Sequence, residues 1–126
     1  MVVDTSILIA VLFNEDFGSW AIDRLQENRR YLRMSTVNYT EALILIEDRQ
    51  PQLVHQMRTM IEESLIRFVP VSVAHAEMAA AARLRFPLNL GDCFAYALAK
   101  QENCPVLTLD RDFRKTDVPA ILPNMI

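Results

Sequence analysis

The sequence predicts a three-layer α/β/α sandwich, in which helices cover both faces of a central, mainly parallel sheet of four or five strands. Short apolar runs alternate along the chain with longer segments of helical periodicity, as in parallel strands joined by helical crossovers. Two of the runs, MVVD and VLTLD, end in a carboxylate. A chain of 126 residues, 52% hydrophobic and 23% charged, has the size and composition of one domain, residues 1–126.

The first strand and the first two helices lie at the start of the chain. MVVD is a short apolar run closed by Asp4, and TSILIAVLF follows as a mostly apolar helix. Either Thr5 or Ser6 can cap this helix, because hydroxyl side chains accept the unpaired N–H groups of a first turn. Phe17 to Asn28 has the pattern of a second, amphipathic helix.

The middle of the chain repeats the strand and helix pattern. YLRMS is predicted as the second strand, and TVNYTEALILIED as a helix with Ser35 or Thr36 at its start. Pro51 suits the first turn of a fourth helix, since its missing N–H is not needed there. SLIRFVPV then leads into a third strand.

The last third adds two helices and a further strand. The alanine-rich segment AHAEMAAAARLRF favours a helix by composition alone. LNLGDCFAYALAKQEN is apolar almost all the way round and is predicted as a buried helix, followed after Cys104 and Pro105 by the strand VLTLD.

Charge and composition limit the classes of protein to which this chain can belong. A net charge of -3 and a pI near 5.3 do not favour binding of nucleic acid by bulk electrostatics, although they do not exclude it. No apolar run approaches the roughly 18 residues of a membrane span, and no basic segment precedes the first apolar one. We expect a cytoplasmic protein without membrane contact, in which Cys93 and Cys104 are reduced.

Five acidic or amide residues at the ends of these elements have an ordinary structural interpretation. Asp4 can cap the helix that follows it, and Asn89 with Asp92 three positions later resembles a capping box. Asp110 and Asp112 in LDRDF can be turn residues. Taken singly, each of these residues is explained by its local backbone.

Glu41 is harder to explain as structure alone. It shares a helix face with Val37, Ile44 and Leu45, so it lies on an apolar stripe that points inward. A buried glutamate needs a partner that compensates its charge. The sequence therefore predicts a polar site beside this helix.

A parallel sheet would bring the acidic residues together. Asp4 and Asp110 follow strands, whereas Glu41 and Asp92 lie early in helices that begin at the same edge of the sheet. Such a cluster needs protons or cations, and hard oxygen ligands suit Mg²⁺ or Mn²⁺. We therefore expect Asp4, Glu41, Asp92 and Asp110 to bind a divalent metal. Carboxylate-bound divalent ions of this kind catalyse the hydrolysis of phosphodiester bonds.

Four segments in this order resemble a known family. MVVDTSILIA, STVNYTEALI, LNLGDCFAYALAK and VLTLDRDF are together similar to a PIN domain, and closely to the VapC toxins of bacterial toxin–antitoxin pairs. The resemblance spans nearly the whole chain. The chain has a short link, RLRFPLNLGD, where many close relatives have a longer loop that contains Gly and Lys. This difference affects the substrate contacts that the resemblance implies.

The resemblance implies an activity and a set of site residues. It implies an endoribonuclease that uses Mg²⁺ or Mn²⁺ to cleave RNA, often transfer or ribosomal RNA. Asp4, Glu41 and Asp92 would be the core acidic residues, with Ser6 hydrogen-bonding beside Asp4. The fourth acidic residue would be Asp110, which matches the TxDxDF form of the family pattern. Close relatives often keep instead the acidic residue just before the Phe, which here is Asp112.

The resemblance also implies protein partners. It implies a homodimer and a VapB-type antitoxin, with higher hetero-oligomers formed by the two proteins together. Leu43 to Ile46 and the segment Leu53 to Leu65 carry apolar surface compatible with such partners, or with packing against their own sheet alone.

Other classes of protein fit less well. A phosphoacceptor domain of the receiver type needs paired acidic residues at the first strand and a late Lys, which MVVDTS and VLTLD lack. A haloacid dehalogenase-type phosphatase needs a second Asp where Ser6 stands. A non-catalytic PIN-like module that binds RNA or protein, and a PIN nuclease of RNA processing, remain as alternatives.

Overall fold

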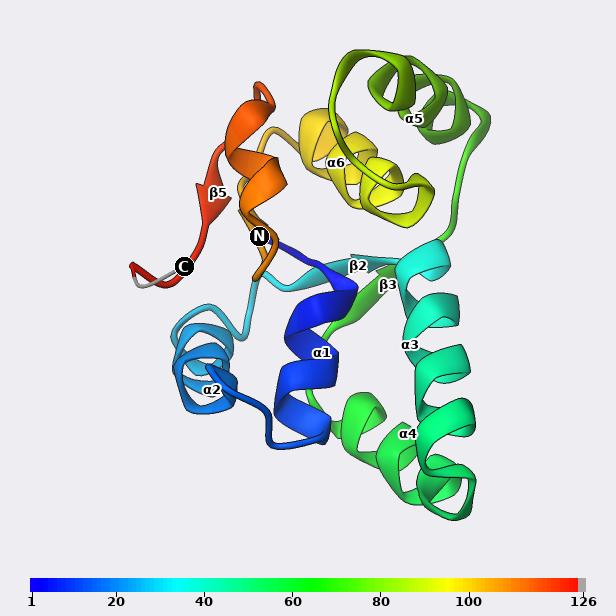
Figure 1. Cartoon of the computed structure of the whole chain (residues 1–126), viewed down its shortest axis with the longest axis vertical. Helices are drawn as coiled ribbons and strands as arrows, with labels where there is room; N and C mark the ends of the chain where they lie inside the picture. The colour runs from blue at the N-terminus through cyan, green and yellow to red at the C-terminus, as the bar shows by residue number, and fades with distance from the viewer. Residues whose placement is uncertain (125–126) are drawn as a thin grey trace.

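The computed structural model describes residues 1–124 and shows one parallel sheet of five strands (Figure 1). The strand order is β3-β2-β1-β4-β5, and each neighbouring pair is parallel. The strands are β1 (Val2–Val3), β2 (Arg33–Ser35), β3 (Arg67–Val69), β4 (Val106–Leu107) and β5 (Ala120–Ile121). The predicted fold class is therefore confirmed.

Helices cover both faces of the sheet. In Figure 1, α5 and α6 lie together on one side of the sheet, and α1 to α4 lie on the other. The helices are α1 (Thr5–Leu12), α2 (Gly18–Glu27), α3 (Thr36–Arg49), α4 (Val54–Glu63), α5 (Val73–Arg85) and α6 (Leu90–Glu102), with short 3-10 helices η1 (Pro51–Leu53) and η2 (Arg111–Lys115). Within residues 1–124, no helix is long and apolar enough to cross a membrane.

The two central strands contribute to two separate cores. Successive strand residues point to opposite faces of a sheet. Val2 and Val106 accordingly pack with α5 and α6, whereas Val3 and Leu107 pack with the layer of α1 to α4. All four are fully buried, which explains why these strands read as continuous apolar runs rather than as alternating patterns.

The helix starts follow the predictions in two cases and differ in one. Ser35 Oγ accepts the Val37 N–H at the start of α3, and Asn89 caps α6. The expectation that Thr5 or Ser6 caps the first helix is wrong: the capping position is Asp4, and no side chain caps that end. Both hydroxyls make other hydrogen bonds, so they serve the site instead.

Two predicted boundaries also change. Pro51 opens the 3-10 turn η1, and the regular helix α4 begins only at Val54. The strand predicted for VLTLD ends at Leu107, and the following residues form a turn that leads into η2. Asp110 therefore lies on a turn beyond the sheet, where its side chain caps η2.

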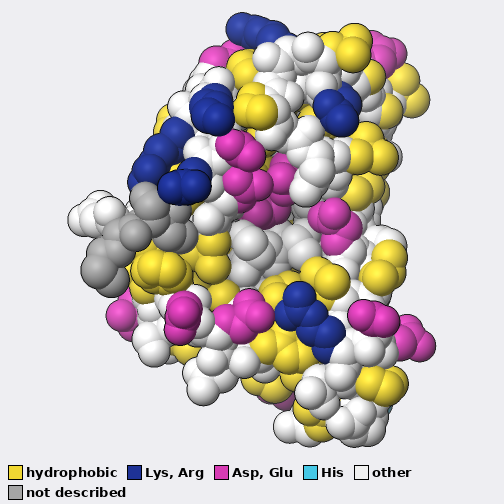
Figure 2. Space-filling model, in the orientation of Figure 1, with side chains coloured by type: hydrophobic (Ala, Val, Ile, Leu, Met, Phe, Trp, Pro, Cys, Tyr) yellow, Lys and Arg dark blue, Asp and Glu magenta, His cyan; other side chains and the backbone are white. Residues whose placement is uncertain are grey.

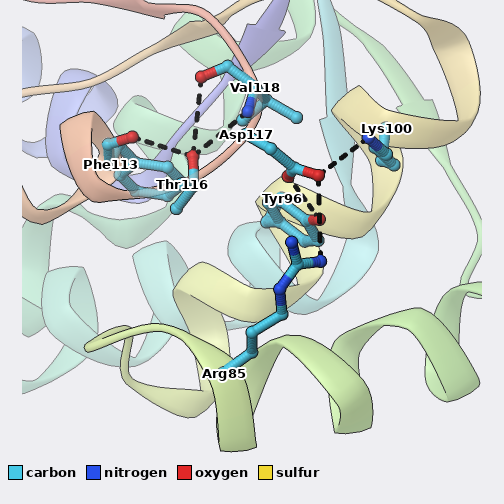
Figure 3. A network of polar contacts seen from close by, with 7 residues as sticks. All are labelled: Arg85, Tyr96, Lys100, Phe113, Thr116, Asp117 and Val118. Carbon is cyan, nitrogen blue, oxygen red and sulfur yellow. Dashed lines mark hydrogen bonds and ion pairs between the residues drawn. The ribbon is translucent and has the colours of Figure 1, made fainter.

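A cluster of polar contacts attaches the segment after η2 to α6 (Figure 3). Asp117 accepts hydrogen bonds from the Tyr96 hydroxyl at 2.6 Å and from Lys100 Nζ at 2.9 Å, with Arg85 of α5 at 3.9 Å. These contacts, chiefly the Tyr96 hydrogen bond, hold the pKa of Asp117 below its ordinary value. The chain beyond Asp110 is thus held against α6, which carries Asp92.

Candidate active site

A pocket of about 330 Å³ opens where the carboxyl ends of the strands meet the starts of α1, α3 and α6. Figure 2 shows a cluster of acidic side chains in a hollow on this face. The sheet edge brings together the four predicted metal ligands, and the pocket is lined by Asp4, Glu41, Asp92 and Asp110. Ser6 lines the same pocket.

Asp4 is the most buried of the four, with 2% of its surface exposed. Its Oδ2 atom accepts hydrogen bonds from Ser6 Oγ at 2.9 Å and from Thr108 Oγ1 at 2.8 Å. Its Oδ1 atom is buried and has no hydrogen-bond partner within residues 1–124. One oxygen is therefore fixed by the protein, and the other is left for a ligand such as a cation.

Two hydroxyl groups join the end of β1 to the turn after β4. The fully buried Thr108 accepts the Asp110 N–H at 2.9 Å, and Ser6 Oγ accepts the Leu109 N–H at 3.0 Å. Both hydroxyls donate to Asp4. The same two side chains thus set the positions of Asp4 and of the backbone at Asp110.

Asp92 lies in the first turn of α6, with 7% of its surface exposed. Its N–H donates to Asn89 Oδ1 at 2.8 Å, so the predicted cap is present and holds the residue in place. Burial, and then the charges of Asp4 and Asp110, raise the pKa of Asp92 to about 8. The pKa of Asp4 is also raised, mainly by burial. Without a cation, Asp92 retains its proton near neutral pH.

Asp110 and Asp112 have different surroundings. Asp110 lines the pocket, and its Oδ1 accepts the Asp112 N–H at 2.9 Å. Asp112 is not among the residues that line the pocket, and its carboxylate lies 3.3 Å from Lys115 Nζ. The geometry favours Asp110 as the fourth acidic residue of the site.

This difference leads to a prediction for the two positions. We expect Asp110→Asn to weaken Mn²⁺ binding and RNA cleavage by about tenfold or more, because one ligand oxygen loses its charge. Asp112→Asn removes only an exposed ion pair and should change either quantity less than about threefold. Titration calorimetry and cleavage rates measured on both variants compare the two positions. A larger loss at Asp112 would assign the site to that residue instead.

The structure adds polar residues that sequence reasoning missed. Thr5, Asn38 and Thr108 bind the acidic side chains, and Glu15 lines the outer part of the pocket, where it pairs with Arg49 at 3.3 Å. Asn38 precedes Glu41 by three positions and so shares its inward helix face, which is the one signal that could have identified it. Thr5, Glu15 and Thr108 have no distinctive spacing in the sequence relative to the acidic residues.

The donor set fits a divalent cation in its chemistry. The pocket offers carboxylate oxygens, a buried Asp4 Oδ1 without a partner within residues 1–124, and Asp92, whose pKa is raised by burial and then by the neighbouring carboxylates. Within residues 1–124, no group of three or more His, Cys, Asp or Glu side chains is arranged so that it could already hold a metal ion. Carboxylate oxygens are the protein ligands of Mg²⁺, which keeps several waters and takes only a few of them.

The fold and the pocket define an α/β protein whose acidic site lies at the carboxyl edge of a parallel sheet. A family model described as PIN domain matches residues 1–119, and the chain belongs to that family. A VapC ribonuclease from Mycobacterium bovis is 35% identical over 97% of this chain and 98% of its own length. A ribonuclease VapC from Mycolicibacterium smegmatis is also 35% identical, over 96% of this chain and 99% of its own length.

Solved structures agree with this assignment. A toxin–antitoxin complex from Klebsiella pneumoniae contains a chain with a TM-score of 0.75 and 25% identity, covering 99% of this chain and 98% of that one. VapC20 from Mycobacterium tuberculosis, described as a sarcin-ricin loop cleaving toxin, has a TM-score of 0.82 over 97% of this chain and 98% of its own. Its identity of 16% supports the fold alone.

Proposed function

We propose that this protein is a metal-dependent endoribonuclease, the VapC-type toxin of a toxin–antitoxin pair, and that residues 1–126 act as one PIN domain. The observation that carries the proposal is the convergence of four carboxylates on one pocket, in a chain 35% identical to VapC ribonucleases over nearly its full length. Transfer or ribosomal RNA is the proposed substrate class.

The pocket supplies the groups that this reaction needs. Asp4, Glu41, Asp92 and Asp110 would hold Mg²⁺ or Mn²⁺, which when bound provides an activated water and neutralises charge on the phosphate. Ser6 and Thr108 fix one oxygen of Asp4 by hydrogen bonds. Asp92, whose pKa is about 8 without metal, releases its proton when a cation binds.

The proposal is tested by RNA cleavage with and without a chelator. We expect purified protein to cut total RNA in Mg²⁺ or Mn²⁺ and to lose this activity in excess chelator, because the cation would supply the activated water and neutralise charge on the phosphate. Asp4→Asn is the control against a contaminating nuclease, and mapping of the new RNA ends identifies the substrate. Cleavage that survives exhaustive chelation contradicts the metal mechanism. RNA binding without cleavage would favour a non-catalytic PIN-like module.

We further propose a VapB-type antitoxin as partner, a toxin homodimer, and higher hetero-oligomers of the two, all in the cytoplasm. Similar solved structures include a toxin–antitoxin complex from Klebsiella pneumoniae and a DNA-bound VapBC from Salmonella typhimurium. The apolar residues expected to face partners are in part exposed: Ile44 by 61%, Met60 by 46% and Leu65 by 65%. Copurification with the product of a neighbouring antitoxin gene separates this proposal from a PIN nuclease of RNA processing.

Basic residues border the acidic pocket and offer contacts for an RNA backbone. Figure 2 shows Lys and Arg side chains directly beside the acidic cluster, in the region that η2 occupies in Figure 1. Arg111 and Lys115 of η2 are exposed and follow Asp110 closely along the chain. Because the whole chain carries a net charge of -3, attraction of RNA to this face must be local.

We therefore expect Arg111→Gln to weaken binding of a labelled single-stranded RNA in chelator. One phosphate contact contributes about fivefold at 0.1 M salt, from a salt slope of roughly 0.7 per contact on single strands. Fluorescence anisotropy across salt concentrations measures both the affinity and the slope. Arg67→Gln, an exposed charge at the opposite, amino-terminal end of β3, is the matched control. Equal losses in the two variants would indicate a non-specific charge effect.

A further inference from the structure

The Glu41 carboxylate accepts hydrogen bonds from one side chain of α1 and from one of its own helix, α3. Thr5 Oγ1 of α1 donates to Glu41 Oε1 at 2.8 Å, and Asn38 Nδ2 donates to the same oxygen at 3.0 Å. The second hydrogen of Asn38 Nδ2 goes to the Gly91 carbonyl oxygen at 3.0 Å. Asn38 is fully buried and so connects the Glu41 carboxylate to the first turn of α6.

Gly91 lies directly beneath this carboxylate. A Cβ atom at position 91 would lie 2.0 Å from Glu41 Oε2, 2.3 Å from Cδ and 2.4 Å from Oε1. These distances are far inside van der Waals contact, so the carboxylate occupies the space that any side chain at this position would fill. Gly91 does not have a positive φ, so the backbone conformation is not what requires glycine here.

We infer that Gly91 and Asn38 form a seat for the Glu41 carboxylate and act as positioning residues for the proposed cation site. Hydrogen bonds occupy Oε1, which leaves Oε2 as the oxygen available to a cation. Gly91 belongs to the turn of α6 that carries Asp92, so the seat fixes Glu41 relative to a second candidate ligand. The inference rests on the proposed metal site, but the seat itself is a property of the metal-free protein.

The seat predicts an unusual response to Gly91→Ala. In a helix, replacing glycine by alanine normally raises stability, because alanine has the higher helix propensity. Here the added methyl must displace a carboxylate at the end of a flexible side chain, so the fold survives but Glu41 leaves its hydrogen bonds. We expect a lower melting temperature in chelator and about tenfold weaker Mn²⁺ binding, a typical loss when a ligand's support is removed.

The test is a cycle of variants that includes Glu41→Ala. In the Glu41→Ala background the space above Gly91 is empty, so Gly91→Ala should raise the melting temperature and leave the remaining Mn²⁺ affinity unchanged. Removing one charge from a crowded acidic cluster favours folding of that background. Asn38→Leu, which keeps similar bulk without hydrogen bonds, should also weaken Mn²⁺ binding only when Glu41 is present.

Gly18→Ala is the matched control, since Gly18 is the other of the two glycines and its Cβ would lie 2.8 Å from the Ala10 carbonyl oxygen. It should lower the melting temperature and leave Mn²⁺ affinity intact. The inference is overturned if Gly91→Ala raises the melting temperature in both backgrounds, or weakens Mn²⁺ binding equally in both. If the parent protein binds no Mn²⁺, the proposed metal site fails, and the melting cycle alone still decides whether the seat exists.

Discussion

Replacing Asp92 by Asn should abolish RNA cleavage and yet make the metal-free protein more stable near neutral pH, by about 1 kcal/mol or more. The carboxyl is buried beside Asp4 and Asp110, and these surroundings raise its pKa to about 8. In the folded state its ionised form is therefore disfavoured. Asparagine keeps the size of the side chain and is neutral in both the folded and the unfolded state, so it avoids the cost of protonating or burying a carboxylate near neutral pH.

The pH dependence has a definite sign. The folded pKa of about 8 lies above the ordinary value of 3.8, so folding favours the protonated form. The contribution of Asp92 to stability is greatest below pH 4 and is lost as the pH rises towards 8. The stability advantage of Asp92→Asn over the parent should accordingly grow between pH 4 and pH 8, as denaturant unfolding in chelator at several pH values can measure.

Asp92 has a competing role as a first-turn charge on α6. If that role dominated, Asp92→Asn would lose a favourable interaction with the helix dipole, costing roughly 0.3 to 1 kcal/mol. The cap itself is unaffected, because it uses the backbone N–H of residue 92 and Asn89 Oδ1. Added Mn²⁺ should stabilise the parent far more than the variant. A destabilised variant with an undiminished Mn²⁺ response would leave Asp92 as a structural residue only.

The fold was predictable because its central strands β1 and β4 are buried on both faces and the strands alternate with helical patterns. The strand boundaries were not predictable, since Thr108 and Leu109 continue the strand-like composition of VLTLD although β4 ends at Leu107. β5 has only two residues, Ala120 and Ile121, and so has no periodicity to detect. The strand order depends on contacts between distant segments, which local patterns do not encode.

The acidic residues were predictable for a different reason. Parallel strands place their carboxyl ends at one edge, so topology alone brings Asp4 and Asp110 near the starts of α3 and α6. The side chains that orient these acidic residues were not predictable, because buried Thr108 and Asn38 belong to residue types with many ordinary roles. Gly91 shows the same limit, since its function is the space it leaves for Glu41.

The Phe of the TLDRDF motif is the structural anchor of η2. Phe113 is fully buried and belongs to the core formed with α5 and α6, while its neighbours Arg111 and Asp112 remain at the surface or half-buried. A 3-10 helix of five residues has little stability of its own. Besides the hydrogen bonds of Ser6 and Thr108 to the backbone before η2, the position of η2 therefore depends on this buried side chain.

Phe113→Ala should lower the free energy of unfolding by about 3 to 5 kcal/mol, the usual loss for a buried phenylalanine whose cavity is not refilled. A domain of this size has a total stability of roughly 5 to 15 kcal/mol, so this variant can approach the limit of folding. Phe113→Leu keeps most of the buried volume and should lose less, which preserves a measurable transition. Arg111→Ala, an exposed neighbour in the same helix, should change stability by no more than about 0.5 kcal/mol. Urea unfolding in chelator compares the three variants with the parent. If Phe113→Ala and Arg111→Ala had equal effects, the attachment of η2 would depend on the polar contacts of Asp117 with α6 rather than on the buried ring.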